Sequence, residues 1–173
     1  MTKTGFIGLG IMGGPMAAHL QDGGCKLYLH DVKNPPLALV EKGATVCTNA
    51  AEVAKRADII IVMVPDTPHV EAVLFGPDGV AGALTPGKIV VDMSSISPLA
   101  TKEFAQKIRQ RGCDYIDAPV SGGEVGARAA TLTIMAGGSA EAFERVLPLF
   151  RMMGKNITLV GANGDGQTAK VAN

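Results

Sequence analysis

The chain has 173 residues, of which 47% are hydrophobic and 18% charged, and it lacks tryptophan. Its 16 basic and 16 acidic residues cancel to a formal net charge of zero, and no charged stretch indicates nucleic acid or a membrane surface as a partner. The longest apolar run, 59–65, is far shorter than the ~20 residues of a membrane-spanning helix, so we expect a single cytoplasmic domain. The 3 cysteines are widely spaced and predict neither a disulfide framework nor a metal site.

Short apolar segments alternate with longer amphipathic segments along the whole chain. Segment 5–8 predicts the first strand, and helical spacing follows over 11–21. The same alternation predicts strands over 26–30, 45–47, 58–65, 88–92, 115–117, 131–136 and 157–160, with helices over 37–42, 50–56, 67–75, 98–111 and 140–151 and a last helix that begins within 164–167. Strands that alternate with helices imply right-handed crossovers. We therefore predict an α/β, Rossmann-type, doubly wound and mostly parallel sheet with helices on both faces.

Three of the predicted helices begin after a side chain that is suited to capping. Asn49, Ser97 and Ser139 each stand directly before a helix, where the side-chain oxygen can accept a hydrogen bond from an unpaired backbone N–H of the first turn. Pro98 follows Ser97 at the first helical position, which tolerates proline because an N–H there would have no partner in the helix.

A glycine-rich loop joins the first predicted strand to the first predicted helix. It has the pattern G-x-G-x-x-G, in which the first glycine permits a tight turn, the second leaves room for a pyrophosphate, and the third lets helix and strand pack closely. The pyrophosphate then accepts hydrogen bonds at the helix N-terminus. The strand–loop–helix context predicts a dinucleotide site. Its residues are Gly8, Leu9, Gly10, Ile11, Met12 and Gly13.

An acidic residue stands at the end of the second predicted strand. Asp31 follows the last glycine of the loop by 31 − 13 = 18 residues, close to the ~20 expected for the acid that binds the adenosine ribose hydroxyls. A carboxylate there repels a 2′-phosphate, so NAD is the expected cofactor. Lys33 could instead receive that phosphate, which leaves NADP as the alternative. The structural alternative for Asp31 is a turn residue before the segment 34–36.

Three motifs in this order resemble the β-hydroxyacid dehydrogenases. They are GLGIMGGPMA at 8–17, DAPVSGG at 117–123 and GDGQTAKVAN at 164–173. The resemblance extends over the whole chain and implies hydride transfer between a nicotinamide cofactor and a small hydroxy acid or semialdehyde. It also implies that Ser95 and the segment Met63, Val64 and Pro65 line the nicotinamide-ribose side of the cofactor.

The second and third motifs carry the expected chemistry. Ser121, Gly122 and Gly123 offer a hydroxyl and successive backbone N–H groups, a combination that suits a substrate carboxylate. Lys170 is the expected general acid, which would protonate the alkoxide that develops on the substrate. Asn173 lies three residues further along and shares that helix face, so it could bind a substrate hydroxyl or carboxylate.

Members of this family continue into a long interdomain helix and an all-helical second domain. We therefore expect residues 1–163 to form the NAD-binding domain and residues 164–173 to begin the interdomain helix, with the C-terminal helical domain absent. The resemblance implies that this missing domain closes the active site and contributes to a homo-oligomer. The chain alone is then expected to bind NAD with little or no turnover.

Several further stretches indicate a branch of the family. Segments 64–68, 92–98, 122–127 and 154–161 look most like the members that reduce tartronate semialdehyde to D-glycerate. One alternative is a relative that acts on 3-hydroxyisobutyrate or 4-hydroxybutyrate. A second is a non-catalytic dinucleotide-binding module, which would keep the segment 8–31 and would not need Lys170.

Overall fold

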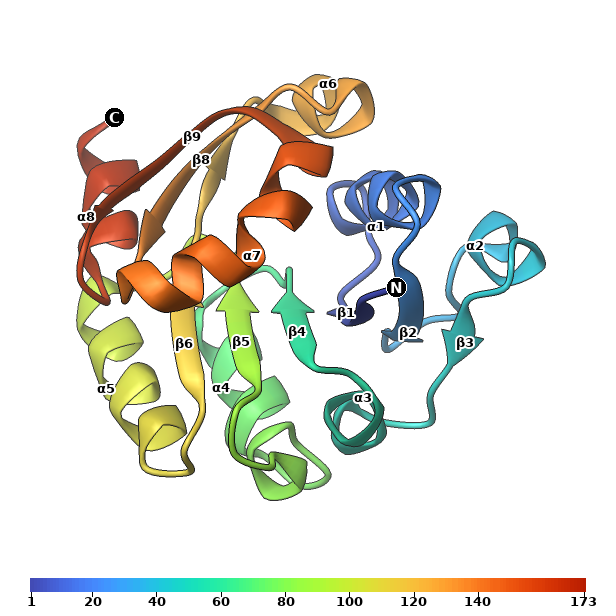
Figure 1. Cartoon of the computed structure of the whole chain (residues 1–173), viewed down its shortest axis with the longest axis horizontal. Coiled ribbons are helices and arrows are strands. Elements are labelled where there is room, and N and C mark those ends of the chain that lie inside the picture. Colours follow the sequence, from blue (N-terminus) through green and yellow to red (C-terminus); the bar gives the residue numbers. More distant parts are fainter.

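Nine strands form one sheet in the computed structural model, which describes residues 1–173 (Figure 1). The strands are β1 (Lys3–Ile7), β2 (Lys26–His30), β3 (Thr45–Val46), β4 (Ile59–Val62), β5 (Ile89–Asp92), β6 (Asp114–Asp117), β7 (Val120–Ser121), β8 (Leu132–Gly137) and β9 (Gly154–Gly161). The helices are α1 (Gly13–Asp22), α2 (Leu37–Glu41), α3 (Ala50–Arg56), α4 (Thr67–Phe75), α5 (Pro98–Arg109), α6 (Gly123–Ala129), α7 (Ala140–Met153) and α8 (Asp165–Ala172), with a 3₁₀ turn, η1, at Ala81–Ala83.

The strand order confirms the predicted fold class. Parallel pairs connect β3-β2-β1-β4-β5-β6, which is the doubly wound order of a Rossmann fold. Beyond β6 the sheet continues with β8, which runs antiparallel to both β6 and β7 and pairs with β9 in parallel. The order reverses between β1 and β4, and ligands of such sheets bind at the carboxyl ends of the strands at this point.

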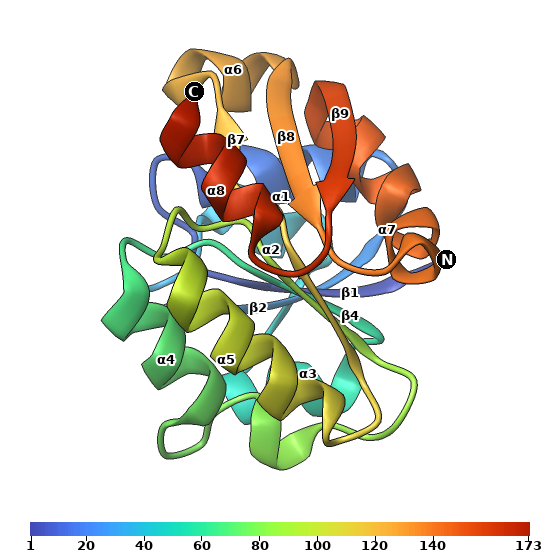
Figure 2. The ribbon, with the colours of Figure 1, turned by 90° about the vertical axis from the view of Figure 1, so that its left-hand side faces the viewer.

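Helices cover both faces of the sheet and produce two apolar cores. Helices α1 and α7 lie on one face, and α3, α4 and α5 lie on the other (Figure 2). Successive side chains of a strand point to opposite faces, so Phe6 joins the first core and Ile7 the second. In β4 the adjacent residues Ile60 and Ile61 also point to opposite faces, Ile60 into the second core and Ile61 into the first. This explains why the segment is apolar without alternation.

The three predicted helix caps are confirmed. Asn49 Oδ1 accepts from the backbone N–H of Glu52 at 2.8 Å, at the start of α3. The Ser97 and Ser139 hydroxyls accept from the third residue of α5 and α7 at 3.2 and 3.1 Å. These contacts pair N–H groups that the helices themselves leave free.

Some predicted boundaries differ from the structure, and β7, α6 and the 3₁₀ turn η1 were not predicted. Helix α1 begins at Gly13 rather than at residue 11, and β4 ends at Val62 rather than at 65. Strand β7 has two residues, and α6 contains two glycines, which weaken the local helical signal. Strand β7 forms only by pairing with β8, which no local pattern indicates.

Candidate active site

The glycine loop has the close contacts that its pattern predicts. Gly8 has a φ of +98°, and a Cβ at this position would overlap the carbonyl of Met63, the residue after β4. A Cβ at Gly13 would overlap the carbonyl oxygen of Gly8, so the start of α1 can approach β1 only with glycine here. At Gly10, by contrast, a Cβ would project into open space in front of α1. That space is where the pyrophosphate of a dinucleotide is expected.

The remaining residues of the loop offer mainly their backbone. The Leu9 side chain is 6% exposed and belongs to the core that α1 covers, whereas the Ile11 side chain is 70% exposed. Met12 is half-buried against the same core as Leu9. None of the three side chains carries a charge, so a phosphate here would depend on backbone N–H groups and the dipole of α1.

A pocket of about 300 Å³ lies beside the loop at the carboxyl ends of β1 and β2. Gly8, Asp31, Asn49 and Val64 are among its lining residues, and the volume is at the lower end of small-molecule sites. Asp31 Oδ1 accepts from the N–H of Val32 at 2.8 Å, which fixes the carboxylate at the rim. The structure therefore brings the loop, Asp31 and Val64 to one cavity.

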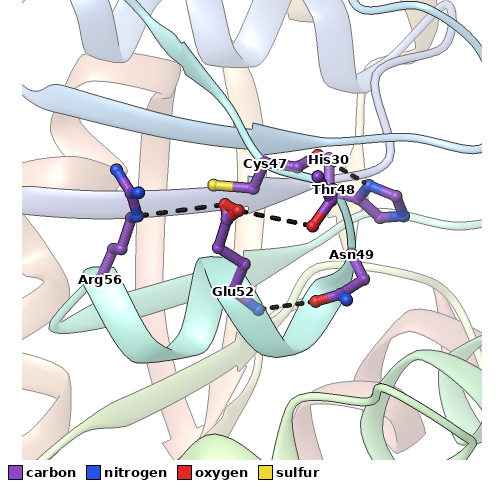
Figure 3. A network of polar contacts seen from close by, with 6 residues as sticks. All are labelled: His30, Cys47, Thr48, Asn49, Glu52 and Arg56. Carbon is purple, nitrogen blue, oxygen red and sulfur yellow. Dashed lines mark hydrogen bonds and ion pairs between the residues drawn. The ribbon is translucent and has the colours of Figure 1, made fainter.

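A network of polar contacts holds the segment 47–49, which leads into α3 and contributes Asn49 to the pocket lining (Figure 3). His30 Nδ1 lies 3.3 Å from the carbonyl oxygen of Cys47, and Thr48 Oγ1 donates to Glu52 at 3.4 Å. Burial, reinforced by the Glu52 carboxylate, raises the pKa of Cys47 to about 11. The thiol is therefore protonated at neutral pH, and Cys47 serves packing rather than nucleophilic chemistry.

The predicted catalytic and substrate residues lie close together beyond β6, where β7 and β8 extend the sheet. Lys170 Nζ on α8 donates to the hydroxyl of Ser121 at 2.9 Å, and Asn173 Nδ2 lies 3.4 Å from the same oxygen. Ser121 ends β7, and Gly122 and Gly123, with φ of +133° and +59°, turn the chain into α6. Lys170, Ser121 and Asn173 thus form one cluster, although 49 residues separate Lys170 from Ser121.

The two loops expected on the nicotinamide side are joined by a residue that sequence reasoning missed. Val64, in the loop after β4, donates its N–H to the buried hydroxyl of Ser94 at 2.9 Å. Ser95, the neighbour that the resemblance singled out, is exposed, as is Pro65. Ser94 therefore fixes the loop, and Ser95 faces solvent beside it.

Two buried carboxyl groups lie beneath this surface. Asp92, at the end of β5, accepts from the N–H of Ser94 at 3.0 Å and from the hydroxyl of Tyr115 at 3.2 Å. Burial raises the pKa of Asp92 to about 7. Asp117, at the end of β6, also has a raised pKa because it is buried. No sequence signal assigned either acid a role, although an acid that ends an apolar strand is a feature to examine.

Two further features concern the side chains and the helices. No three His, Cys, Asp or Glu side chains gather as they would around a metal ion. None of the helices combines the length and the apolar composition that a bilayer crossing requires.

Comparison with known proteins shows the family to which the chain is related. Residues 3–161 match the family model described as the NAD-binding domain of 6-phosphogluconate dehydrogenase. The chain is 57% identical to the 2-hydroxy-3-oxopropionate reductase of Escherichia coli (strain K12), over 99% of this chain and 59% of that protein. It is 45% identical to the 2-(hydroxymethyl)glutarate dehydrogenase of Eubacterium barkeri, over 99% of this chain and 57% of that protein.

Solved structures show the same relationship. The 3-hydroxyisobutyrate dehydrogenase of Mycobacterium tuberculosis, described with L-serine, matches with a TM-score of 0.91 and 36% identity, over 100% of this chain and 59% of that one. The chain thus spans less than two thirds of the length of these relatives. From the glycine loop to residue 161 its sequence and fold follow theirs, and the chain belongs to the 3-hydroxyacid dehydrogenase family, of which it forms an NAD(P)-binding domain.

Proposed function

We propose that the whole protein that carries this chain reduces tartronate semialdehyde to D-glycerate by hydride transfer from NADH. The observation that carries the proposal is the contact between Lys170 Nζ and Ser121 Oγ at 2.9 Å, because it joins a proton donor to a hydroxyl suited to a substrate carboxylate. The 57% identity to a 2-hydroxy-3-oxopropionate reductase supports this choice of substrate.

Different residues of the chain would bind the cofactor and transfer the proton. The backbone of the glycine loop would hold the pyrophosphate, and Asp31 would bind the adenosine ribose. Ser95 and the segment Met63, Val64 and Pro65 would line the nicotinamide-ribose side. The bound cofactor supplies the hydride that reaches the carbonyl carbon of the substrate.

Lys170 completes the reduction at the carbonyl oxygen. As the carbonyl carbon gains a hydride, its oxygen becomes an alkoxide, and the Lys170 ammonium transfers one proton from Nζ to that oxygen. The ammonium has three donor hydrogens, of which Ser121 accepts one, so two remain for the substrate. Ser121 can donate its own hydroxyl hydrogen to the substrate carboxylate, and Gly122, Gly123 and Asn173 would add donors beside it.

Steady-state assays of the whole protein test the proposal. NADH oxidation is measured with tartronate semialdehyde, with the semialdehyde of 3-hydroxyisobutyrate and with succinic semialdehyde, for the wild type, Lys170→Ala and Lys155→Ala. Lys155 is an exposed lysine of β9 and serves as the control. We expect tartronate semialdehyde to give the highest kcat/KM, and Lys170→Ala to lower kcat by roughly 10²–10⁴-fold, the range of general acid catalysis.

Each of the other outcomes has a definite meaning. A higher kcat/KM with another semialdehyde would show that the proposed substrate is wrong and the proposed reaction is right. NADH binding without turnover of any semialdehyde, unchanged by Lys170→Ala, would identify a dinucleotide-binding module instead of an enzyme.

We also propose that residues 1–163 act as the cofactor domain and that 164–173 lead into a further part of the protein. The side chains of Ser95 and Asn173 are exposed, and Val171 on α8 is 75% exposed, so the surface around Lys170 is open on one side. Water reaches an open site, which weakens electrostatic stabilisation of the alkoxide. The isolated chain should therefore bind NADH with little turnover, and an assay beside the whole protein tests this.

A further inference from the structure

We propose that Gln167 is a positioning residue. It fixes the position of the Lys170 ammonium relative to the loops after β4 and β5, which are expected on the nicotinamide side of the cofactor. The inference rests on the proposed function, in which Lys170 is the proton donor. Gln167 lies in the first half of α8, and its side chain is 1% exposed although it is polar. A buried amide is stabilised only when both its donor and its acceptor are paired.

The Gln167 amide is paired on both sides of Ser95. Its Nε2 donates to the carbonyl oxygen of Ser94 at 2.7 Å, and its Oε1 accepts from the N–H of Ile96 at 3.1 Å. The amide therefore pairs backbone groups of the loop after β5, as the backbone of a neighbouring strand would. The exposed Ser95 lies between the two bonded residues, so Gln167 fixes the loop at the point expected to face the cofactor.

The contact continues to the loop after β4. The Ser94 hydroxyl accepts from the N–H of Val64 at 2.9 Å, so one serine joins Gln167 to both loops through its carbonyl and its hydroxyl. Two successive hydrogen bonds thus lead from α8 through Ser94 to Val64, beside the glycine loop. No other side chain of α8 bonds to either loop.

The backbone of Gln167 is held independently from beneath. Asp117 Oδ2 accepts from the N–H of Gln167 at 3.2 Å, and its Oδ1 accepts from the N–H of Gly164 at 2.9 Å. Helix α8 has no cap from its own residues, so this carboxylate of β6 pairs the N–H groups at its positive end. A Cβ at Gly166 would come within 2.5 Å of the carbonyl oxygen of Met135, so this turn is also packed tightly on β8.

Lys170 lies one helical turn beyond this anchored turn. Residues three apart in a helix share a face, so a rotation or shift of α8 at Gln167 moves the base of the lysine side chain directly. Asp117 fixes the helix to the sheet, whereas only Gln167 fixes it to the cofactor loops. Loss of the amide should therefore leave α8 folded while the distance between Nζ and the reacting oxygen changes.

A double-mutant cycle in the whole protein tests the role. Gln167→Met removes both amide bonds and nearly keeps the volume, and Thr168→Ala, an exposed position on the same helix, is the control. We expect Gln167→Met to lower kcat at least tenfold, since small misplacements of a catalytic group have large effects on rate. The Kd for NADH should change by less than about threefold, a shift below 1 kcal/mol.

The same substitution in a Lys170→Ala background separates positioning from general damage. If Gln167 acts through Lys170, Gln167→Met should lower the residual kcat of Lys170→Ala by less than about twofold, because residues that act as a unit are not additive. An equal loss in both backgrounds would overturn the inference, as would a kcat of Gln167→Met equal to that of Thr168→Ala.

Two further results complete the test. If Gln167→Met does not fold, Gln167→Asn decides, because its amide is one carbon shorter and cannot make both bonds without movement of α8. Its kcat should fall at least threefold with NADH affinity kept, and an unchanged kcat contradicts the inference. Should Lys170→Ala keep the wild-type kcat, the proposed function fails whatever Gln167 does. If Lys170→Ala has a lowered kcat while Gln167→Met keeps the wild-type kcat, only the positioning role is refuted.

Discussion

The hydroxyl of Tyr115 donates to Asp92 at 3.2 Å between two neighbouring strands of the sheet, and both side chains are buried. The pair lies directly under Ser94, which holds the loop after β4. Burial raises the pKa of Asp92 from its ordinary 3.8 to about 7, and it raises the pKa of Tyr115 as well. The buried carboxyl group therefore makes the stability of the chain sensitive to pH.

Stability should fall as the pH rises through this range. Between about pH 4 and pH 7 the folded chain keeps the Asp92 proton that the unfolded chain releases, so the contribution of Asp92 to the free energy of unfolding decreases toward pH 7. Asp92→Asn should remove this decrease and be more stable than the wild type at pH 8. Urea unfolding at pH 5 and pH 8 measures it, with Glu144→Gln at an exposed acid as control. Equal pH dependence in both variants would contradict the prediction.

The two later glycines of the loop should respond differently to an added methyl group. Gly10→Ala places a Cβ in open space, so the thermal stability of the chain should be kept while NADH binds roughly tenfold more weakly, or worse, a loss of about 1.4 kcal/mol. Gly13→Ala creates an overlap with the carbonyl of Gly8 and should lower the Tm itself. Calorimetric titration and thermal unfolding of both variants check the pair. A Gly10→Ala variant that loses thermal stability but binds NADH with normal affinity would contradict this prediction.

Asp31 should control the choice between the two nicotinamide cofactors. Its carboxylate would lie near the 2′ position of the adenosine ribose, and repulsion of a phosphate there costs ~1 kcal/mol or more per charge in water. Asp31→Ser should therefore strengthen NADPH binding roughly tenfold and weaken NADH binding. Titration with each cofactor measures the ratio of the two Kd values, and Asp22→Ser, at the far end of α1, should leave it unchanged. If the ratio is the same in both variants, Asp31 is a turn residue.

Ser121 should matter for the substrate more than for the cofactor. Ser121→Ala removes the partner of the Lys170 ammonium and a donor for the substrate carboxylate, and hydrogen bonds to charged groups contribute ~1.5–3 kcal/mol. We expect kcat/KM to fall roughly 10–100-fold with an unchanged Kd for NADH. Thr131→Ala, at an exposed position before β8, is the control. A loss of NADH affinity instead would place Ser121 in the cofactor site.

Local signals were sufficient for much of this fold. The three capped helices and the apolar segment of β4 each follow from patterns within the segment itself, and the structure confirms them. Strand β7 was missed because Val120 becomes a strand residue only by pairing with Ile134 of β8, and helix α6 was missed because its two glycines weaken the helical signal. No spacing within the segment itself indicates that partner.

The candidate site was predictable only where its chemistry follows a motif. Lys170 and Ser121 stand in segments that resemble known dehydrogenases, and the structure brings them within 2.9 Å. Ser94, Asp117 and Gln167 were missed because their roles depend on contacts between residues 30, 47 and 73 positions apart. A glutamine on a helix is ordinarily a solvent-facing residue, and only its burial shows otherwise.

The strand order places the residue proposed for nucleotide binding and those proposed for proton transfer in separate halves of one sheet. Asp31 follows β2, on one side of the switch point, whereas Lys170 and Ser121 lie beyond β6, on the other. Substitutions that alter nucleotide preference therefore need not disturb the proposed proton donor. Such a protein can exchange one coenzyme for another, or one acid for another, in independent evolutionary steps.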